Sequence, residues 1–460
     1  MKNKRTLSVF SLVMINVVAI DSLRNLPINA AYGYSIIFFY IICAIGFLIP
    51  CALVTAELAT QWPKTGGTYV WVREAFGPKY GFLNIWMQWI YNVVWYPTIL
   101  SFIGATIASL INPAIIHDRY YMMGIIISCF LLATYANCRG MRLSSFVSEA
   151  GAILGTIVPM LLIIILGFTT FFLHQHRTLA YFSFLPDLSD WHNISFLVVV
   201  MFSLIGIEMS SVHAEEVKNP EKDYPKALLI SSIIILVSLI FASVAIAIAV
   251  PNNTLNIVDG LNQAFYAFFK QYHLGWFFPI VEVLIIIGGF AGISTWVIGP
   301  TKGLLIAAQD GSMPKKFAQT NKKGAPVNIL VLQAVVVIVL SLTFLVFPSV
   351  EGAYWFLSDL TVQLAVIYYL TIFFAAIRLR YKFPDRNKNA FKIPGGNRGM
   401  IITAGLGIFS CLFGLLIGFI PPEKIMVGSR VFYVLALIAG IVIFSLPPLI
   451  IYKLNKKTPP

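Results

Sequence analysis

Long apolar runs recur from one end of this chain to the other, and they constrain its fold more than any other feature. A helix needs about 20 residues to cross roughly 30 Å of hydrocarbon. We therefore predict an all-α membrane protein with twelve transmembrane helices. The expected spans are residues 7–33, 35–57, 80–111, 121–136, 146–173, 194–216, 226–250, 275–309, 326–347, 353–377, 399–420 and 431–452.

Composition supports the same class. Of the 460 residues, 58% are hydrophobic and 11% are charged, whereas soluble domains average about 25% charged residues. The 5 cysteines lie in or beside apolar runs without paired spacing, which indicates small buried residues rather than disulfides or a zinc site. The chain carries no His/Cys metal cluster, nucleophile motif or phosphate-binding glycine loop. We therefore expect no enzyme activity, no metal and no cofactor.

Basic residues are distributed unevenly between the predicted loops. With the N-terminus placed in the cytoplasm, 26 of the 32 Lys and Arg residues fall on the cytoplasmic side and 5 on the outer side, which leaves Arg24 within the membrane. Cytoplasmic loops of membrane proteins carry this excess. Both termini are therefore predicted to be cytoplasmic, and the net charge of +13 is attributed to contact with anionic lipid rather than with nucleic acid.

The first apolar run is interrupted where a lipid-facing helix should be entirely apolar. Asp21, Arg24 and Asn25 lie close together, and Pro27 follows them. A charge at the bilayer centre costs about 2.5–3.5 kcal/mol even on a lenient scale. We therefore predict that the helix is broken here and lines a wet cavity, where free N–H and C=O groups could bind a zwitterion.

The sixth run contains a similar interruption, with Gly206 and Glu208 in the middle of the span. Breaks at positions one and six predict an inverted repeat with a binding site at its interface. Helices 1–5 (about 7–173) would form one repeat and helices 6–10 (about 194–377) the other. Helices 11 and 12 (about 399–452) would be peripheral in a single transmembrane domain spanning 1–460.

Four short stretches resemble the amino acid–polyamine–organocation permease superfamily. Pro63–Val72 resembles its proline, double-glycine and tyrosine loop, and Glu215–Pro225 resembles its Asn-Pro and Tyr-Pro signature. Ser294–Gly303 and Phe391–Gly396 are similar to the glutamate/γ-aminobutyrate antiporter branch. The resemblance implies a LeuT-like 5+5 inverted repeat with broken helices 1 and 6, in a multi-pass transporter of amino acids, as small-molecule substrates, in the bacterial plasma (inner) membrane.

Two positions depart from that branch. Gly292 stands where the acid antiporters place a carboxylate, and the stretch Asp21–Asn25 replaces a less charged one. We therefore expect pocket chemistry that differs from that of the glutamate carriers.

The first break supplies the first set of predicted substrate contacts. The half-helix that begins near Pro27 would direct its positive end at a substrate carboxylate. Arg24 could grip a second carboxylate bidentately, or instead be neutralised by an internal ion pair. The partner would then be Asp21, Glu282 or Asp359. Asp21 could also bind a substrate ammonium or act in gating. The predicted contacts are Ser22, Leu23, Arg24 and Asn25.

The second break supplies backbone carbonyls at Ile205, Gly206 and Ile207, which should accept from a substrate ammonium. Glu208 could carry a proton or clamp the broken helix through a hydrogen bond. Trp296 follows small residues and could cap the substrate, although membrane aromatics more often serve packing. The predicted gating or pocket residues are Tyr96, Thr361 and Tyr368.

The function that these features favour is secondary active transport by alternating access. Exchange of one amino acid for another, or for an amine, is the first expectation. A proton-coupled symporter and a non-transporting amino acid sensor are the alternatives.

Overall fold

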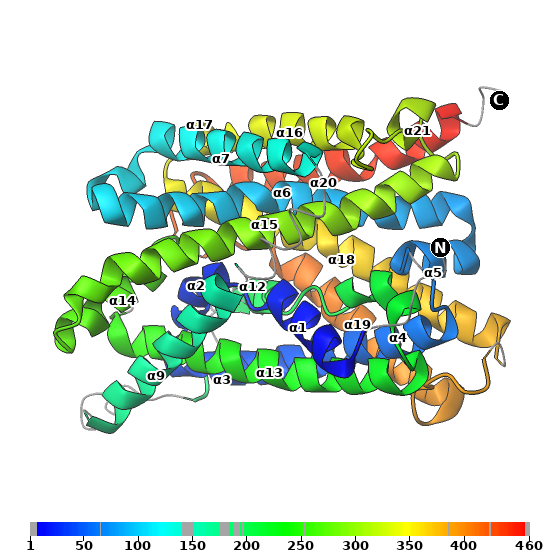
Figure 1. Ribbon diagram of the computed structural model, residues 1–460, viewed down its shortest axis with the longest axis horizontal. Helices are drawn as coiled ribbons and strands as arrows, with labels where there is room; N and C mark the ends of the chain where they lie inside the picture. Colours follow the sequence, from blue (N-terminus) through cyan, green and yellow to red (C-terminus); the bar gives the residue numbers. More distant parts are fainter. Residues whose placement is uncertain are drawn as a thin grey trace.

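The computed structural model describes residues 7–64, 66–139, 151, 153–173, 184–186, 194–195, 197–251, 254–384, 387–422 and 425–455. Within these ranges helices are joined by turns and loops, and the β-structure is limited to an isolated backbone bridge between Leu7 and Val217. Most helices run roughly parallel to the long axis of the molecule (Figure 1).

The N-terminal half of the chain contains α1 (Val9–Ile20), η1 (Leu23–Asn25), α2 (Leu26–Ala30), η2 (Gly33–Ser35), α3 (Ile36–Cys43), η3 (Ala44–Leu48), α4 (Ile49–Gln61), α5 (Thr68–Phe76), α6 (Pro78–Ile111), η4 (Pro113–His117), α7 (Arg119–Arg139), η5 (Ile153–Ile157), α9 (Val158–Leu173), α12 (Leu197–Phe202) and η7 (Met209–Glu216). The C-terminal half contains α13 (Pro220–Ala249), α14 (Gly260–Gln271), η8 (Gly275–Phe277), α15 (Phe278–Gln309), η9 (Lys315–Ala318), α16 (Val327–Ser341), α17 (Thr343–Val346), α18 (Val350–Lys382), α19 (Gly396–Ile417), α20 (Arg430–Ser445) and α21 (Pro447–Asn455).

Ten helical segments in the described ranges are long and apolar enough to cross a membrane, and an eleventh is obtained when the bent pair Val9–Ile20 and Leu23–Ala30 is taken as one span. Uninterrupted helices therefore do not reproduce the expected count of twelve. Two of the twelve expected spans, residues 7–33 and 194–216, have no single long helix, since α1 comprises 12 residues and α12 comprises 6. The protein is thus an all-helical, multi-pass membrane protein.

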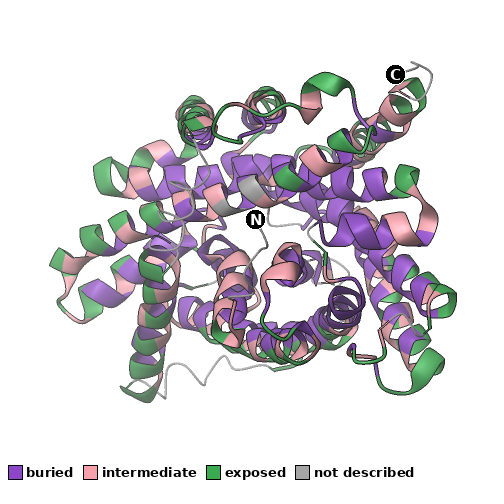
Figure 2. Cartoon of the chain, turned by 45° about the vertical axis from the view of Figure 1, so that its right-hand side comes forward, coloured by how far each residue is buried: buried purple, intermediate pink, exposed green. Residues whose placement is uncertain are grey.

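The centre of the bundle is formed by α6, which packs against both α15 and α18. The α1 segment packs against α13, which in turn packs against α9. Buried residues concentrate in the interior of the molecule, and exposed residues lie along the outer helices (Figure 2). Many exposed side chains are large and apolar, among them Phe172, Phe409 and Ile443. Apolar side chains on the outer helices are compatible with contact to lipid hydrocarbon, because no water is present there to favour the burial of these side chains.

Two sets of contacts tie distant segments together. Glu57 on α4 forms a buried ion pair with Arg380 on α18, with Arg380 Nη1 2.5 Å from each carboxylate oxygen. The Ile393 N–H donates to Glu57 Oε2 (2.7 Å), so the loop before α19 joins the same contact. Elsewhere, Leu7 N donates to Glu216 O (2.9 Å) and Lys218 N donates to Leu7 O (3.2 Å).

Candidate functional site

The first break begins where α1 ends at Ile20. Asp21 N still donates to Val17 O (2.7 Å), whereas Ser22 adopts an extended conformation with φ −104° and ψ 116°. Helical structure resumes as a short 3₁₀ turn and then α2, bent by 41° from α1. Pro27 lies in the first turn of α2, where its missing N–H leaves no helical hydrogen bond unmade.

The second interruption follows α12, which ends at Phe202, and gives way to turns before η7. Gly206 adopts φ +120°, and its N–H donates to Tyr369 OH (2.9 Å). A Cβ at this position would lie 3.1 Å from the Trp296 ring and 3.3 Å from Ile20 Cγ1. Both the dihedral angle and the close approach therefore require glycine.

Arg24 lies between the first break, α6 and α18, and it is only 1% exposed. Its Nη1 donates to Thr98 Oγ1 (2.9 Å), Tyr354 OH (3.2 Å) and Ser358 Oγ (3.2 Å), and its Nη2 donates to Asn25 Oδ1 (2.6 Å). All of these acceptors are neutral. Arg24 Nε has no hydrogen-bond partner. The buried guanidinium is thus held in place without being neutralised.

Two aromatic rings flank the same guanidinium. Its carbon lies 4.9 Å from the centroid of Phe202 and 5.3 Å from that of Tyr354, distances at which a cation is attracted to a ring face. Among the described residues no carboxylate forms a salt bridge with Arg24. The alternative of an internal ion pair is therefore wrong for this structure.

Each of the three carboxylates proposed as partners of Arg24 has a different contact. Asp359 accepts from Tyr433 and Gln363, and Glu282 Oε2 accepts from Ser109 Oγ (2.8 Å). Asp21 accepts from Ser238 Oγ on α13, with distances of 3.0 and 2.9 Å to its two oxygens. Asp21 is 5% exposed and has no cationic partner among the described residues.

A small cavity of about 40 Å³ lies against the first break. From the predicted set, it brings together Asp21, Ser22, Leu23, Arg24 and Trp296. The remaining wall comes from α1, α6, η5 and α15. It is formed by Val18, Ala19, Trp95, Ile99, Phe102, Gly155, Thr156, Ile285, Gly288, Gly289 and Gly292.

Two tryptophans close one part of this cavity. The rings of Trp95 and Trp296 lie 6.0 Å apart, and Trp296 Nε1 donates to Ala19 O (3.2 Å) at the end of α1. Gly292, on the same helix as Trp296, has no heavy atom within 4 Å of the position that a Cβ would take. The absent side chain at Gly292 therefore leaves space in the cavity wall.

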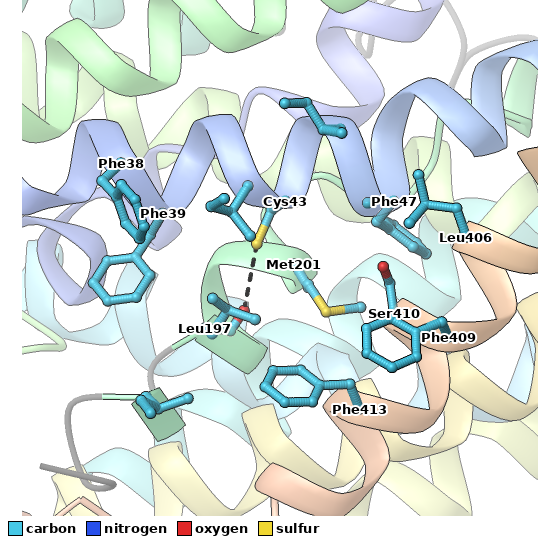
Figure 3. Close-up of a pocket in the computed structure, with 14 residues that line it drawn as sticks. Phe38, Phe39, Cys43, Phe47, Leu197, Met201, Leu406, Phe409, Ser410 and Phe413 are labelled. Atoms are coloured by element: carbon cyan, nitrogen blue, oxygen red, sulfur yellow. Dashed lines mark hydrogen bonds between the residues drawn. The ribbon is translucent and has the colours of Figure 1, made fainter. Parts of the chain in front are cut away.

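A larger groove, of about 380 Å³, lies elsewhere, between α3, η3, α12 and α19. Phe38, Phe39, Phe47 and Phe413 surround it, and Ser410 supplies one of the few polar atoms (Figure 3). This groove offers no charged group to a polar ligand. The smaller cavity beside Asp21 and Arg24 is therefore the candidate site.

Glu208 is the last residue of the second interruption, just before η7, and is 1% exposed. Its Oε2 accepts from Tyr369 OH (2.6 Å) and its Oε1 accepts from Tyr368 OH (3.1 Å). Tyr368 OH also lies 3.3 Å from Thr68 Oγ1, which follows the double-glycine loop. The carboxyl group thus connects the sixth segment to α18 and α5.

Other predicted residues lie outside the cavity lining. Tyr96 packs against Phe130, with ring centroids 5.0 Å apart, and Thr361 donates to Leu357 O (2.7 Å) within its own helix. The Gly206 carbonyl accepts from Met209 N (2.9 Å). The prediction that this carbonyl is free to bind a substrate is therefore wrong. Ile205 and Ile207 flank this turn and are buried.

Several residues that hold the site were not singled out from the sequence. Thr98, Tyr354 and Ser238 each contact a charge of the first break. Hydroxyl side chains are common in membrane helices, and their spacing along the chain carries no signal of what they contact. Only the polar residues of the broken segment itself were conspicuous in the sequence.

A second group of acidic residues lies near α14, at the opposite end of the bundle from α21 (Figure 1). Asp259 Oδ1 accepts from Asn262 Nδ2 (2.7 Å), and Glu351 Oε1 lies 3.1 Å from His117 Nδ1. Burial raises the pKa of Asp259 to about 7, although the hydrogen bond from Asn262 and the charge of His117 both oppose this shift. This group lies apart from the residues that line the cavity.

Comparison with known proteins identifies relatives along nearly the whole chain. A family model described as amino acid permease matches residues 6–444. An uncharacterized transporter of Legionella pneumophila is 50% identical over 447 residues, covering 97% of this chain and 96% of its own. A glutamate/γ-aminobutyrate antiporter of Lactococcus lactis is 27% identical over 470 residues, covering 99% of this chain and 92% of its own.

More distant similarities extend the comparison. A polyamine transporter of Arabidopsis thaliana is 26% identical over 414 residues, covering 87% of this chain and 78% of its own. The crystal structure of MhsT in complex with L-phenylalanine matches with a TM-score of 0.62 at 15% identity, covering 90% of this chain and 99% of that chain. At that identity the match concerns the fold alone.

Proposed function

Because this chain belongs to the amino acid permease family, we propose that it is a secondary transporter that carries amino acids across the bacterial inner membrane by alternating access. The single observation that carries this proposal is the buried cavity beside the broken first span, lined by Asp21 and Arg24. Charged groups at that depth are tolerated where they serve a substrate pathway. The glutamate/γ-aminobutyrate antiporter among the relatives supports exchange as the mode.

The proposed architecture has twelve spans in a single domain, with both termini in the cytoplasm. Helices 1–5 (7–173) and 6–10 (194–377) form the inverted repeats, and helices 11 and 12 (399–452) are peripheral. The interruptions at residues 21–22 and 203–208 support this assignment, because each lies within the first helix of its repeat. The fold likeness to MhsT is consistent with it.

The proposed substrate contacts are the first break, the carbonyls of Ile205 and Ile207, and the indole of Trp296. The half-helix that begins near Pro27 would direct its positive end at the substrate carboxylate, although the Leu26 N–H itself donates to Leu23 O. Trp296 touches both interrupted segments, through Ala19 O and against Gly206. A shift of either segment would therefore change the position of the indole over the cavity.

Exchange is tested in proteoliposomes that contain the purified protein. Labelled amino acid should enter several times faster when the vesicles are preloaded with unlabelled amino acid than when they are empty. A panel of proteinogenic amino acids and their decarboxylated amines, supplied inside, identifies the counter-substrate. Protein-free vesicles and the exposed variant Arg139→Gln serve as controls. Equal uptake rates in preloaded and empty vesicles would contradict exchange.

Glu208 favours proton coupling as a second candidate mode. Two tyrosine hydroxyls contact its carboxyl group, and among the described residues no cation pairs with it. Glu208→Gln should flatten the pH dependence of uptake. The amide has nearly the same size and can accept from one tyrosine hydroxyl and donate to the other, but it cannot titrate between pH 5 and 8. The profile is measured with inner and outer pH varied separately. An unchanged profile would exclude Glu208 from proton transfer and leave it as a helix clamp.

A further inference from the structure

The apolar groove between α3, η3, α12 and α19 opens onto the outside of the bundle. Ile42 and Ile45 on one side of the groove are exposed, and so are Leu406 and Phe409 on the other. These residues belong to the apolar perimeter of the membrane-spanning helices. The groove is therefore continuous with the lipid-facing surface, and hydrocarbon chains are the molecules beside its opening.

The extent of the groove matches one leaflet of a bilayer. Its lining on the second span runs from Phe38 to Phe47, which is about 13 Å at roughly 1.5 Å of rise per residue. Phe47 is the middle residue of the 29-residue apolar segment Gly33–Gln61. A hydrocarbon core of about 30 Å gives each leaflet roughly 15 Å. The groove thus reaches from near one end of the span to its midpoint, the depth that one acyl chain occupies.

The lining of the groove favours an aliphatic ligand. The residues that line it include no charged side chain. Its volume of about 380 Å³ is within the range of roughly 300–1,000 Å³ that is typical of ligand pockets. Phe38 and Phe39 lie at one end, and Phe47 lies at the other (Figure 3). Near Phe47 the helices η3 and α19 come together, because a Cβ on Gly46 would lie only 2.5 Å from Ser410 Oγ. This close approach limits how deeply a chain can enter.

The groove also borders α12, the short helix before the second interruption. Leu197 and Met201 of this helix line the groove. The ring centroid of the next residue, Phe202, lies 4.9 Å from the guanidinium carbon of Arg24. Because α12 comprises only 6 residues, it depends on tertiary packing for its stability. An empty groove would leave α12 without van der Waals partners on this side, so a bound chain would complete the packing of α12.

We propose that the groove binds one acyl chain of a membrane phospholipid, with the terminal methyl group near Phe47 and the headgroup beyond Phe38, and that this chain holds α12 against α3 and α19. This proposal goes beyond transport and does not depend on the identity of the substrate. Tyr34 lies one turn before Phe38, and tyrosines are common where a span meets the lipid headgroups. The methyl group would point toward the middle of the membrane, as in the surrounding leaflet.

Photo-crosslinking of the full-length protein in lipid nanodiscs tests this site. The probe is a phosphatidylethanolamine with a diazirine near the terminal methyl group of one acyl chain, and labelled residues are located by mass spectrometry. Labelling around Phe47 should saturate as the fraction of probe in the bilayer rises. Labelling of α16 should instead rise in proportion, because Val331, Val335 and Val339 are also exposed but do not line the groove. Proportional labelling at both places would overturn the proposal.

The position of the diazirine tests the orientation of the chain. A probe with its diazirine next to the headgroup should label residues around Phe38 rather than those around Phe47. The reverse order of the two probes would contradict the proposed orientation and overturn the proposal. A groove covered by a second copy of this chain would be labelled by neither probe, and the complex in the nanodisc would have the mass of two chains. That result would also overturn the proposal.

Two tryptophan variants provide a matched pair. Leu406→Trp adds bulk to the groove from an exposed position on α19 and should lower labelling around Phe47 about tenfold, because a filled site accepts an additional group poorly. Val335→Trp places the same side chain on the exposed face of α16 and should leave that labelling unchanged. Labelling is expressed relative to α16 in the same sample, so differences in the amount of inserted protein cancel. An unchanged ratio in Leu406→Trp would show that the labelled chain does not lie in the groove.

Discussion

Replacing Arg380 by methionine is expected to lower the free energy of unfolding by about 3–5 kcal/mol, because a buried ion pair that loses one partner leaves an uncompensated charge. Glu57 is 3% exposed and, among the residues that the structure describes, would keep the hydrogen bond from Ile393 N alone. That loss is a large fraction of the roughly 5–15 kcal/mol by which folded proteins exceed their unfolded states. Chemical unfolding in detergent micelles, followed by circular dichroism, measures it.

The matched control is Lys382→Met, which removes an exposed cation in the last turn of the same helix. Lys382 Nζ donates to a backbone carbonyl, Glu74 O, and lies 5.1 Å from the centroid of the Phe383 ring. Because Lys382 is exposed, its removal should change stability by less than about 0.5 kcal/mol. Combining Arg380→Met with Glu57→Gln should recover part of the loss, because the stranded charge is removed as well. A single Arg380→Met variant as stable as the parent would show that this ion pair does not anchor α18 to α4.

Substituting Gly206 by alanine should reduce exchange about ten- to a hundredfold while leaving the folded protein intact. Strained backbone at a non-glycine residue costs of order 1–3 kcal/mol, and Gly206 has φ +120°. The added Cβ would also press on Trp296 and Ile20, which disturbs the cavity wall and the end of α1 together. Initial exchange rates in proteoliposomes, normalised to the amount of protein, measure the effect.

Gly405→Ala is the control for that substitution. Gly405 lies within α19, where no heavy atom lies within 4 Å of an added Cβ and φ is not positive. This change should leave exchange unaltered and slightly favour the helix. A Gly206→Ala variant with a normal exchange rate would contradict the interpretation that the turn at Gly206 shapes the cavity wall.

The sequence predicts interruptions in the first and sixth apolar runs because local chemistry marks them. Asp21 and Arg24 in an apolar run, and Gly206 beside Glu208 in another, conflict with a continuous lipid-facing helix. The structure ends α1 at Ile20 and α12 at Phe202 accordingly. The number of uninterrupted membrane helices differs from twelve for the same reason.

The surroundings of Arg24 could not be predicted in the same way. Tyr354 lies 330 positions away along the chain, and nothing in its local sequence distinguishes it from tyrosines that merely pack. Ion pairing with Glu282 or Asp359 was a reasonable alternative from charge alone. Tertiary packing decides which buried charges form an ion pair. Here Tyr433 donates to Asp359 and Ser109 donates to Glu282 instead.

The two backbone hydrogen bonds of Leu7 have a mechanical consequence. Because Leu7 is joined to Glu216 and Lys218, the chain just before the first span is fastened to the chain just after the sixth. Neither segment can swing away from the other on that side of the membrane without breaking both bonds. If the protein opens on that side, the two segments would move together as one rigid body. The substrate would then be released by one coupled movement rather than by two independent ones.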